Sequence, residues 1–384
     1  MMEIKSLKEI ASLIRTGKTP PTKEEKYFDG EINWYSPGDL DKTKYLFTAK
    51  RTITQQAIED KKAITFPKDT LLVGCIGDIG KLGITSELSS SNQQLTGVLP
   101  NNETNVSYLY YWFKGNKKVL ENYSNNAVVP ILNNRTLETV KIPLPPLDQQ
   151  KKIAAILDAA DTYRQKTKAL IKKYDELTQS LFLDMFGDPV SNPMEWDKVA
   201  LNELCDFKKT SVKPEEIETG DTYIGLECIE KQTGKILERF IVEAGEIKSN
   251  KFWFDSNYIL YGKLRPYLNK VANPDFEGVC STDIIPIRPI LKNTVKEFII
   301  SLLRGSWFVS FADERCSGAN LPRISPKEVE KYQTINPPIK LQNQFAERVQ
   351  AIEAQKAQAQ ASLAQADHLF NSLLQRAFKG KLTS

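Results

Sequence analysis

The feature that most constrains the fold is the long stretch from Asp148 to Phe186, which contains neither proline nor glycine. Pro143, Pro145 and Pro146 precede it and Gly187-Asp188-Pro189 follows it, so a single helix has a marked start and a marked stop. At about 1.5 Å per residue, such a helix is a rod of about 60 Å. Most helices of globular domains are far shorter, and the rest of the chain is therefore expected to be arranged around this one.

Residues along this stretch recur with the spacing of a helix that packs lengthwise on another helix. Two series are spaced by sevens, three residues apart: Ile153, Ala160, Thr167, Tyr174 and Leu181, and then Ile156, Tyr163, Leu170 and Leu177. The pattern predicts an a/d seam of about four heptads in a coiled coil. The alternative is an amphipathic core helix inside one globular domain.

A second helix of the same length is visible in the same chain. Lys340 to Phe378 again lacks proline and glycine, follows Pro337-Pro338 and is closed by Gly380. A shift of 192 residues places Gln150 on Gln342 and Phe186 on Phe378 without a gap. Because the chain has 384 residues, this shift is half its length, and the sequence predicts two copies of one structural repeat.

The second helix differs from the first in one respect. Its residues at the second series of seam positions, Arg348, Gln355 and Ser362, are polar. We therefore expect its contact face to be rotated towards three apolar residues, which are Val349, Leu363 and Phe370.

The segments before the two helices are expected to be globular and of the α+β class. Residues 1–146 are predicted to contain helices at Ser6–Ile14 and Val106–Phe113, strands at Ile32–Tyr35, Ala63–Phe66, Thr70–Cys75 and Leu95–Leu99, and a segment Val128–Ile142 that leads into the prolines. Residues 187–338 repeat the plan, with 298–305 matching 108–115 and Val271 matching Leu82. The predicted boundaries are a domain at 1–146, a helix at 147–186, a domain at 187–338 and a helix at 339–384.

The two helices are predicted to run antiparallel, because the ends of a compact domain usually lie close together. The architecture is then two pseudo-symmetric globular α/β domains separated by two long antiparallel helices. This arrangement places the C-terminus near the N-terminus. We predict that a circular permutant that joins Ser384 to Met1 by a short linker and opens at Gly187 folds and functions, as judged by solubility and activity. An insoluble or inactive permutant would contradict this geometry.

The composition of the chain argues against several classes of function. No apolar run approaches 18 residues and the N-terminus lacks a signal-peptide core, so neither a membrane span nor secretion is expected. The five cysteines are scattered without a CxxC pair, which disfavours a disulfide framework or a zinc knuckle and favours a reducing cytoplasm. A net charge of +4 is too small to indicate nucleic acid by itself.

Three segments resemble a known family. KIPLPPLDQQKKIAAIL, the helix end LFLDMFGDP and NPPIKLQNQFAERV are similar to the conserved regions of type I restriction–modification specificity subunits (HsdS). Residues 68–84 and 258–271 look like the strand–loop–strand of that family's target recognition domains. The order domain–helix–domain–helix resembles the family over essentially the whole chain.

The resemblance implies a DNA sequence-specificity subunit that is not itself an enzyme and uses no cofactor. Each domain would recognise one half of a bipartite site in double-stranded DNA. The helix pair would set the spacing and dock DNA methyltransferase subunits, of which two are expected. Restriction (endonuclease–translocase) subunits would join in the full cytoplasmic complex.

Nine residues are candidate DNA contacts, and the alternative for each is a solvated turn residue. They occupy a glycine-rich loop of the first domain, the equivalent loop of the second, and the stretches before each long helix. Asn and Arg are base-contacting types, and Arg or Lys also grips phosphate. The candidates are Lys81, Asn133, Asn134, Arg135, Lys263, Arg265, Lys270, Asn320 and Arg323.

Catalytic alternatives are weak. Asn336-Pro337-Pro338-Ile339 resembles a motif of amino-methyltransferases, but isoleucine replaces the aromatic residue that stacks on a flipped base. The loop Gly77–Leu82 lacks P-loop spacing, and the lone His368 has no partner motif for a triad or a metal site. Two rivals remain, which are a coiled-coil adaptor with two protein-binding end domains and a self-contained methyltransferase.

One basic stretch of the first helix leaves two interpretations open. Arg164, Lys166, Lys168, Lys172 and Lys173 form either a solvated face, which is the usual case, or a face that attracts the DNA spacer through its phosphates.

Overall fold

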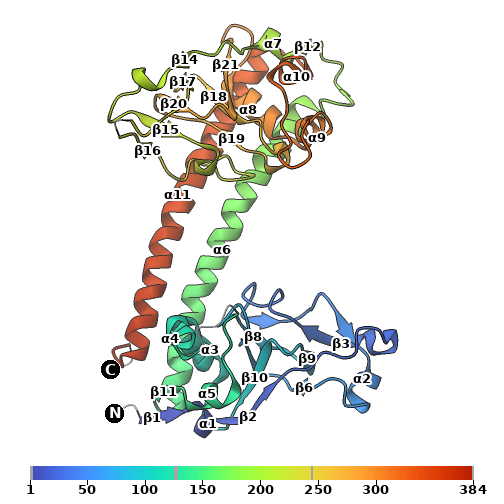
Figure 1. Cartoon of the computed structure of the whole chain (residues 1–384), viewed down its shortest axis with the longest axis vertical. Helices are drawn as coiled ribbons and strands as arrows, with labels where there is room; N and C mark the ends of the chain where they lie inside the picture. Colours follow the sequence, from blue (N-terminus) through green and yellow to red (C-terminus); the bar gives the residue numbers. More distant parts are fainter. Residues whose placement is uncertain (1–2, 125–128, 244, 383–384) are drawn as a thin grey trace. The chain divides into compact units, whose positions relative to one another are not determined.

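The computed structural model describes residues 3–124, 129–243 and 245–382, and it divides into two units (Figure 1). Unit 1 comprises Met1–Lys166 and Ser362–Ser384, and unit 2 comprises Thr167–Ala361. Each unit therefore contains one globular part and one half of each long helix.

Unit 1 is built on a mixed sheet with the strand order β2-β10-β7-β8-β4. These strands are β2 (Ala11–Thr16), β10 (Leu95–Pro100), β7 (Leu71–Gly74), β8 (Leu82–Thr85) and β4 (Tyr45–Leu46). A smaller sheet contains β5 (Thr52–Ile53), β3 (Phe28–Tyr35), β9 (Ser89–Ser91) and β6 (Thr65–Phe66), and β1 (Glu3–Ser6) pairs with β11 (Lys141–Leu144). The helices are α1 (Leu7–Ile10), α2 (Gln55–Glu59), α3 (Val106–Gly115), α4 (Lys117–Tyr123) and α5 (Asn134–Thr139).

Unit 2 contains the same kind of sheet, with the order β13-β21-β18-β19. These strands are β13 (Cys205–Asp206), β21 (Ile284–Pro289), β18 (Ile259–Gly262) and β19 (Val271–Ala272). A second sheet contains β14 (Ser211–Val212), β17 (Lys251–Phe254), β20 (Gly278–Cys280), β15 (Thr222–Ile224) and β16 (Phe240–Ile241), and β12 (Lys198–Ala200) pairs with β22 (Gln333–Ile335). The helices are α7 (Leu201–Leu204), α8 (Lys296–Arg304), α9 (Ser306–Glu314) and α10 (Pro326–Glu330).

The two strand orders show how the halves of the chain correspond. β2, β10, β7 and β8 have their counterparts in β13, β21, β18 and β19, and α3 has its counterpart in α8. β8 begins at Leu82 and β19 at Val271, the two residues that the sequence comparison matched. The smaller sheets differ in strand number and order, and they carry most of the divergence between the halves.

The two long helices are α6 (Leu147–Phe186) and α11 (Ile339–Phe378), and each begins one residue before the stretch singled out in the sequence, Asp148–Phe186 or Lys340–Phe378. In unit 1 the first half of α6 packs on the last half of α11, with Arg164 bonded to Asp367. In unit 2 the last half of α6 packs on the first half of α11, where Phe186 meets Phe345. The helices are therefore antiparallel, and the predicted fold class of two α/β domains with an antiparallel helix pair is confirmed.

The predicted seam of α6 is only half right. The first series is buried or half-buried, but the second series is 38–54 % exposed: Ile156, Tyr163, Leu170 and Leu177. The residues four positions after the first series are buried or half-buried instead: Leu157, Arg164, Ile171, Thr178 and Met185. The rotation expected for α11 is present, since Val349 and Phe370 are buried and Leu363 is half-buried. Equivalent positions are buried in the two helices, because each helix packs on a globular part as well as on its partner helix.

Equivalent ion pairs join the helices in each unit. In unit 1, Arg164 contacts Asp367 at 2.6 Å. In unit 2, Lys356 contacts Asp175 at 2.5 Å. The shift of 192 residues converts one pair into the other, because Arg164 becomes Lys356 and Asp175 becomes Asp367. Each half of the sequence thus supplies one cation and one anion to the seam, as an antiparallel pair of repeated helices requires.

A buried glutamine connects the start of each long helix to its domain. The amide nitrogen of Gln342 donates to the Pro337 carbonyl (2.8 Å), and its oxygen accepts from the Thr294 hydroxyl (2.7 Å) and the Val295 amide (3.2 Å). Gln150 bonds in the same way to Pro145 and to the Asn105 amide. Val295 and Asn105 are the N-cap residues of α8 and α3, so each glutamine ties two helix starts together.

We expect Gln342→Leu to lower the free energy of unfolding of unit 2 by about 3 kcal/mol, because it leaves several buried polar groups without a partner. Urea unfolding followed by tryptophan fluorescence measures the change. Gln350→Leu is the matched control, since Gln350 is exposed on the same helix and bonds only to Glu297 in the described part of the chain. Equal effects of the two substitutions would contradict this role of Gln342.

The predicted helix at Ser6–Ile14 is wrong. Only Leu7–Ile10 is helical, and Ala11–Thr16 forms β2, which pairs antiparallel with β10. The two buried residues of the short helix, Leu7 and Ile10, satisfy a helical pattern over one turn only. Pairing with the edge of the sheet then decides the conformation of the residues that follow.

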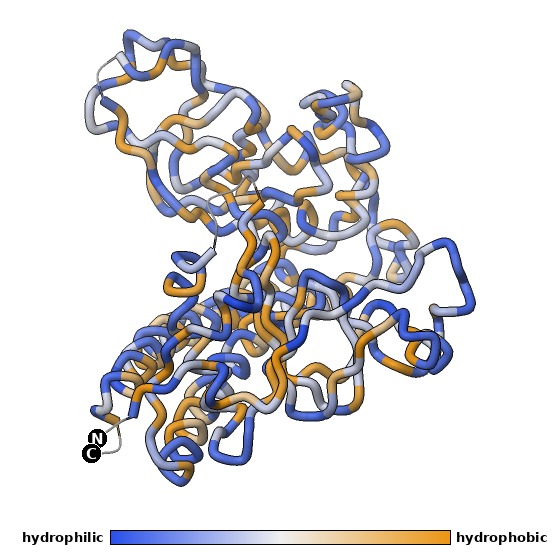
Figure 2. Tube along the Cα trace, turned by 60° about the horizontal axis from the view of Figure 1, so that its bottom comes forward, coloured by the Kyte–Doolittle hydropathy of each residue, from blue (hydrophilic) through white to orange (hydrophobic). Residues whose placement is uncertain are grey.

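The core of each unit lies between its sheet, α3 or α8, and the long helices. Hydrophobic residues run along the inner segments of each unit and hydrophilic residues along its outer loops (Figure 2). Leu382 packs against the core of unit 1, to which β1 also belongs, so both ends of the described chain are in one unit. Met1, Val128 and Ser384, which the sequence-based predictions used, lie outside the described residues. No helix in the described part of the chain is long and apolar enough to cross a membrane.

Candidate nucleic-acid interface

The loop between β18 and β19 carries three of the candidate residues in unit 2. Backbone hydrogen bonds hold it against the segment before α10: Arg265 N donates to Pro322 O (2.8 Å), and Ile324 N donates to Lys263 O (3.1 Å). Arg265 and Asn269 adopt left-handed backbone conformations, with φ of 51° and 49°. Non-glycine residues in this region carry strain that the surrounding structure must offset, and such strain gathers at functional sites.

A carboxylate brings two of these candidates together. Asp283 accepts from Arg323 through both oxygens, at 3.0 Å from Nε and 3.2 Å from Nη2, and lies 3.8 Å from Lys263 Nζ. The hydrogen bond from Arg323 lowers the pKa of Asp283, and the same bond raises the pKa of Arg323. Asp283 and Arg323 therefore both stay ionised throughout the neutral range.

The other candidates of unit 2 are placed differently. Arg265 and Asn320 are exposed, and Arg265 makes no ion pair within the described residues. Lys270 is half-buried and donates to the Leu226 carbonyl at 2.6 Å, so its ammonium stabilises the fold of the domain and is not presented to a ligand at the surface.

Unit 1 repeats the backbone arrangement with other side chains. Gly77 N donates to Pro130 O (3.0 Å), and Leu132 N donates to Cys75 O (2.8 Å). Lys81 occupies the place of Lys270, because Gly74 N bonds to Lys81 O as Gly262 N bonds to Lys270 O. The Lys81 ammonium contacts Asp78 at 2.6 Å, and this contact lowers the pKa of Asp78.

The predicted stretch before the first long helix has mainly local roles. Asn133 is exposed and caps α5 by accepting from the Thr136 amide at 2.9 Å. The side-chain oxygen of Asn134 accepts from the hydroxyls of Thr16 and Thr96. Arg135 is exposed on the first turn of α5.

The structure also changes how the two stretches correspond. Ser325 is the N-cap of α10, as Asn133 is of α5. Arg323 is therefore the counterpart of Ile131, two residues before the cap, and not of Arg135. The repeat distance of 192 residues between the long helices already relates these positions, so this correspondence could have been found from the sequence. Asp283 was missed altogether, because no local pattern connects it with an arginine forty residues later.

The segments excluded as catalytic have structural roles. Asn336 N bonds to Asp197 O at 2.8 Å, and the carbonyls of Pro337 and Pro338 accept from Gln342, so this motif begins α11. His368 is exposed on α11. Among the described residues, no group of three or more His, Cys, Asp or Glu side chains could hold a metal ion.

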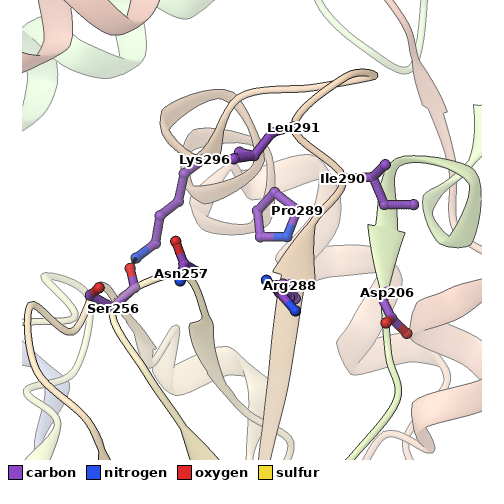
Figure 3. A pocket seen from close by; sticks show the side chains of 8 residues that line it. All are labelled: Asp206, Ser256, Asn257, Arg288, Pro289, Ile290, Leu291 and Lys296. Atoms are coloured by element: carbon purple, nitrogen blue, oxygen red, sulfur yellow. Dashed lines mark hydrogen bonds between the residues drawn. The ribbon is translucent and has the colours of Figure 1, made fainter.

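A surface pocket of about 340 Å³ lies at the opposite end of β21 from Asp283 (Figure 3). Lys296 lines it and donates to the Ser256 carbonyl at 2.6 Å. Burial lowers the pKa of Lys296 to about 8. Asp206 of β13 and Arg288 of β21 also line the pocket. The pocket is thus separate from the loop that carries the candidate residues.

The basic stretch of α6 is not one continuous free face. Arg164 is half-buried between Asp161 and Asp367, with its guanidinium 4.3 Å from the ring centre of Phe370. The four lysines are exposed, and Lys172 lies 3.5 Å from Glu176.

If these lysines attract DNA, the double substitution Lys172→Gln, Lys173→Gln should reduce the salt dependence of binding. The slope of log K against log[salt] is expected to fall by about one to two. Fluorescence anisotropy with a labelled duplex at several salt concentrations measures it. Lys151→Gln, Lys152→Gln on the same helix is the control, since both lysines are exposed outside the patch. An unchanged slope would make the patch a solvated face.

Comparison with known proteins decides the family. The sequence matches the family "Type I restriction modification DNA specificity domain" over residues 1–178 and 193–365. This chain belongs to that family. The family match agrees with the prediction of a DNA specificity subunit that is a non-catalytic component of a restriction–modification complex.

Individual relatives of the specificity family are similar over different lengths. The MjaIX specificity subunit of Methanocaldococcus jannaschii is 31 % identical over 188 residues, which cover 48 % of this chain and 42 % of that relative. The EcoDI specificity subunit of Escherichia coli is 24 % identical over 318 residues, which cover 73 % of this chain and 70 % of that relative. The chain thus spans less than half of the first relative and more than two thirds of the second.

Two solved structures from type I restriction–modification systems share the fold along the whole chain. The S subunit of a type I restriction–modification system from M. genitalium matches with a TM-score of 0.61 at 16 % identity, covering 98 % of this chain and 96 % of that one. A second structure, described under complex assembly and conformational transition of the type I system, matches with a TM-score of 0.56 at 15 % identity, covering 99 % and 98 %.

Proposed function

We propose that this specificity subunit recognises a bipartite target in double-stranded DNA. Recognition domain 1 (residues 1–146) would bind one half of the target and recognition domain 2 (residues 187–338) the other. The observation that carries the proposal is the repeat itself: equivalent loops, on equivalent sheets, are joined to one antiparallel helix pair. Different side chains on equivalent loops suit two half-sites of different sequence.

The helix pair is proposed to set the distance between the half-sites. Forty helical residues correspond to a rod of about 60 Å, and one turn of DNA to about 34 Å. Two domains kept apart by such a rod would contact one face of a duplex about one to two turns apart. The intervening base pairs would form a spacer that neither domain contacts.

The same helix pair is proposed to dock DNA methyltransferase subunits, two of them if each repeat serves one, with restriction–translocase subunits added in the full cytoplasmic complex. The exposed apolar side chains of α6 support this proposal. Leu170 and Leu177 are 43 % and 48 % exposed. Apolar side chains of this kind in a row along a helix are typical of a surface that a partner covers.

A gel-shift experiment separates this proposal from its rivals. The chain is mixed with a randomised duplex library, with and without the candidate methyltransferase, and bound duplexes are selected and sequenced. We expect two short conserved blocks separated by a spacer of fixed length. A coiled-coil adaptor would select no sequence in either sample, and a self-contained methyltransferase would methylate DNA without the added subunit.

A further inference from the structure

The loops of the two recognition domains are held by the same backbone hydrogen bonds, which we call the loop frame. In unit 2 these are Arg265 N to Pro322 O, Ile324 N to Lys263 O, and Lys263 N to Asp283 O (3.0 Å). In unit 1 they are Gly77 N to Pro130 O, Leu132 N to Cys75 O, and Cys75 N to Gln94 O (2.9 Å). The loop frame consists of main-chain atoms only, so these hydrogen bonds can form with different side chains at the same positions.

The side chains on the loop frame differ in charge. Unit 2 carries Lys263, Asp283 and Arg323. The counterparts in unit 1 are Cys75, Gln94 and Ile131, none of which is charged at neutral pH. Since unit 1 makes the equivalent main-chain bonds without these charges, the bonds of the loop frame do not require the charged cluster, and the cluster has another role.

Asp283 reduces the electrostatic attraction of this surface for an anion. It partly neutralises Arg323 and Lys263, while its side chain remains 28 % exposed. At the same time it holds the guanidinium of Arg323 through two hydrogen bonds, which leave Nη1 with one long contact to the Leu321 carbonyl at 3.4 Å. A guanidinium held in one orientation can donate to a base edge with defined geometry, whereas a free one binds phosphates without sequence preference.

We propose that Asp283 is a positioning residue that fixes Arg323 for the recognition of one base pair in the half-site of recognition domain 2. This inference rests on the proposed function. It assigns sequence discrimination to Arg323 at the expense of general affinity, and it assigns Asp283 no direct contact with DNA.

The test compares Asp283→Asn with the unsubstituted chain, each bound to its methyltransferase partner. The probes are the duplex selected by the unsubstituted chain and a duplex of unrelated sequence. We expect binding to the unrelated duplex to strengthen and its salt slope to steepen by about one, because one more cation is released. The preference at one base pair of one half-site should fall about tenfold or more. The other half-site should be unchanged.

Asp275→Asn is the matched control. It makes the same charge change in the same domain, at an exposed acid that pairs with Arg239 at 2.8 Å. Its salt slope can rise, but its base preferences should not change. Asp283→Glu retains a carboxylate and is expected to keep part of the base preference. This variant can replace Asp283→Asn in the test if Asp283→Asn unfolds. Identical selectivity of the two Asn variants would overturn the positioning role.

Arg323→Gln separates failure of this inference from failure of the proposed function. We expect it to lose the same base preference, and Asp283→Asn should then add little to it, because both residues act through one contact. If Arg323→Gln alters selection and Asp283→Asn does not, the positioning role is wrong while DNA recognition stands. If the unsubstituted chain selects no sequence, the proposed function itself fails.

Discussion

Phe182→Ala should destabilise unit 2 by about 3–5 kcal/mol, the largest effect that we expect from a single substitution. Phe182 is fully buried and stacks on Phe298 (5.4 Å between ring centres) and Trp307 (5.3 Å). It also makes edge-to-face contacts with Phe186 and Phe345. It therefore joins α6, α11 and the globular part, and its removal leaves a cavity bordered by α6, α8, α9 and α11.

Differential scanning calorimetry measures this loss as a fall of roughly 10 °C in the melting temperature of unit 2. Leu177→Ala is the control on the same helix, since Leu177 is 48 % exposed and its truncation should cost less than about 0.5 kcal/mol. A change of similar size in both variants would show that α6 is not anchored through the aromatic cluster.

Arg265→Ala should weaken binding of the selected duplex by about 10- to 100-fold and relax selection in one half-site only. Arg265 is exposed in the β18–β19 loop in a left-handed conformation, and it makes no ion pair within the described residues. Its guanidinium is thus available to a ligand without breaking any interaction of the protein. Repeating the duplex selection with the variant identifies the half-site that recognition domain 2 binds.

Arg288→Ala removes the same charge from the same domain and serves as the control. Arg288 is exposed at the other end of β21, beside the pocket of Figure 3. It should leave both half-sites unchanged. Loss of selection in both half-sites after Arg265→Ala would mean that the loop supports the whole subunit rather than one contact. An unaltered selection would remove Arg265 from the interface.

Patterns that extend over many residues allowed the architecture to be predicted from the sequence. The long helices end at Phe186 and Phe378, the last residues of the two stretches that lack proline and glycine, because those residue types mark helix limits. The match of Gln150 with Gln342 identified two equivalent buried side chains. The choice between residues three and four positions along α6 was wrong, because a heptad pattern in the sequence does not show which other surfaces a helix must cover.

The candidate interface was harder to predict, because it depends on contacts between distant segments. Lys263 and Arg265 are neighbours in the sequence and were found together. Asp283 and Arg323 meet only because the β18–β19 loop bonds to the segment before α10. Lys270 was a good candidate by residue type, yet its ammonium bonds to a carbonyl of its own domain.

The loop frame has a consequence for how target preference can change during evolution. Mutations that alter Gln94 or Ile131, which are not buried, would change what a ligand contacts without breaking any of the main-chain bonds that shape the loop. Side chains at these positions can therefore change during evolution with little effect on folding. Such changes can occur in one half of the protein while the other half keeps its target. New combinations of half-sites would then arise by separate small steps.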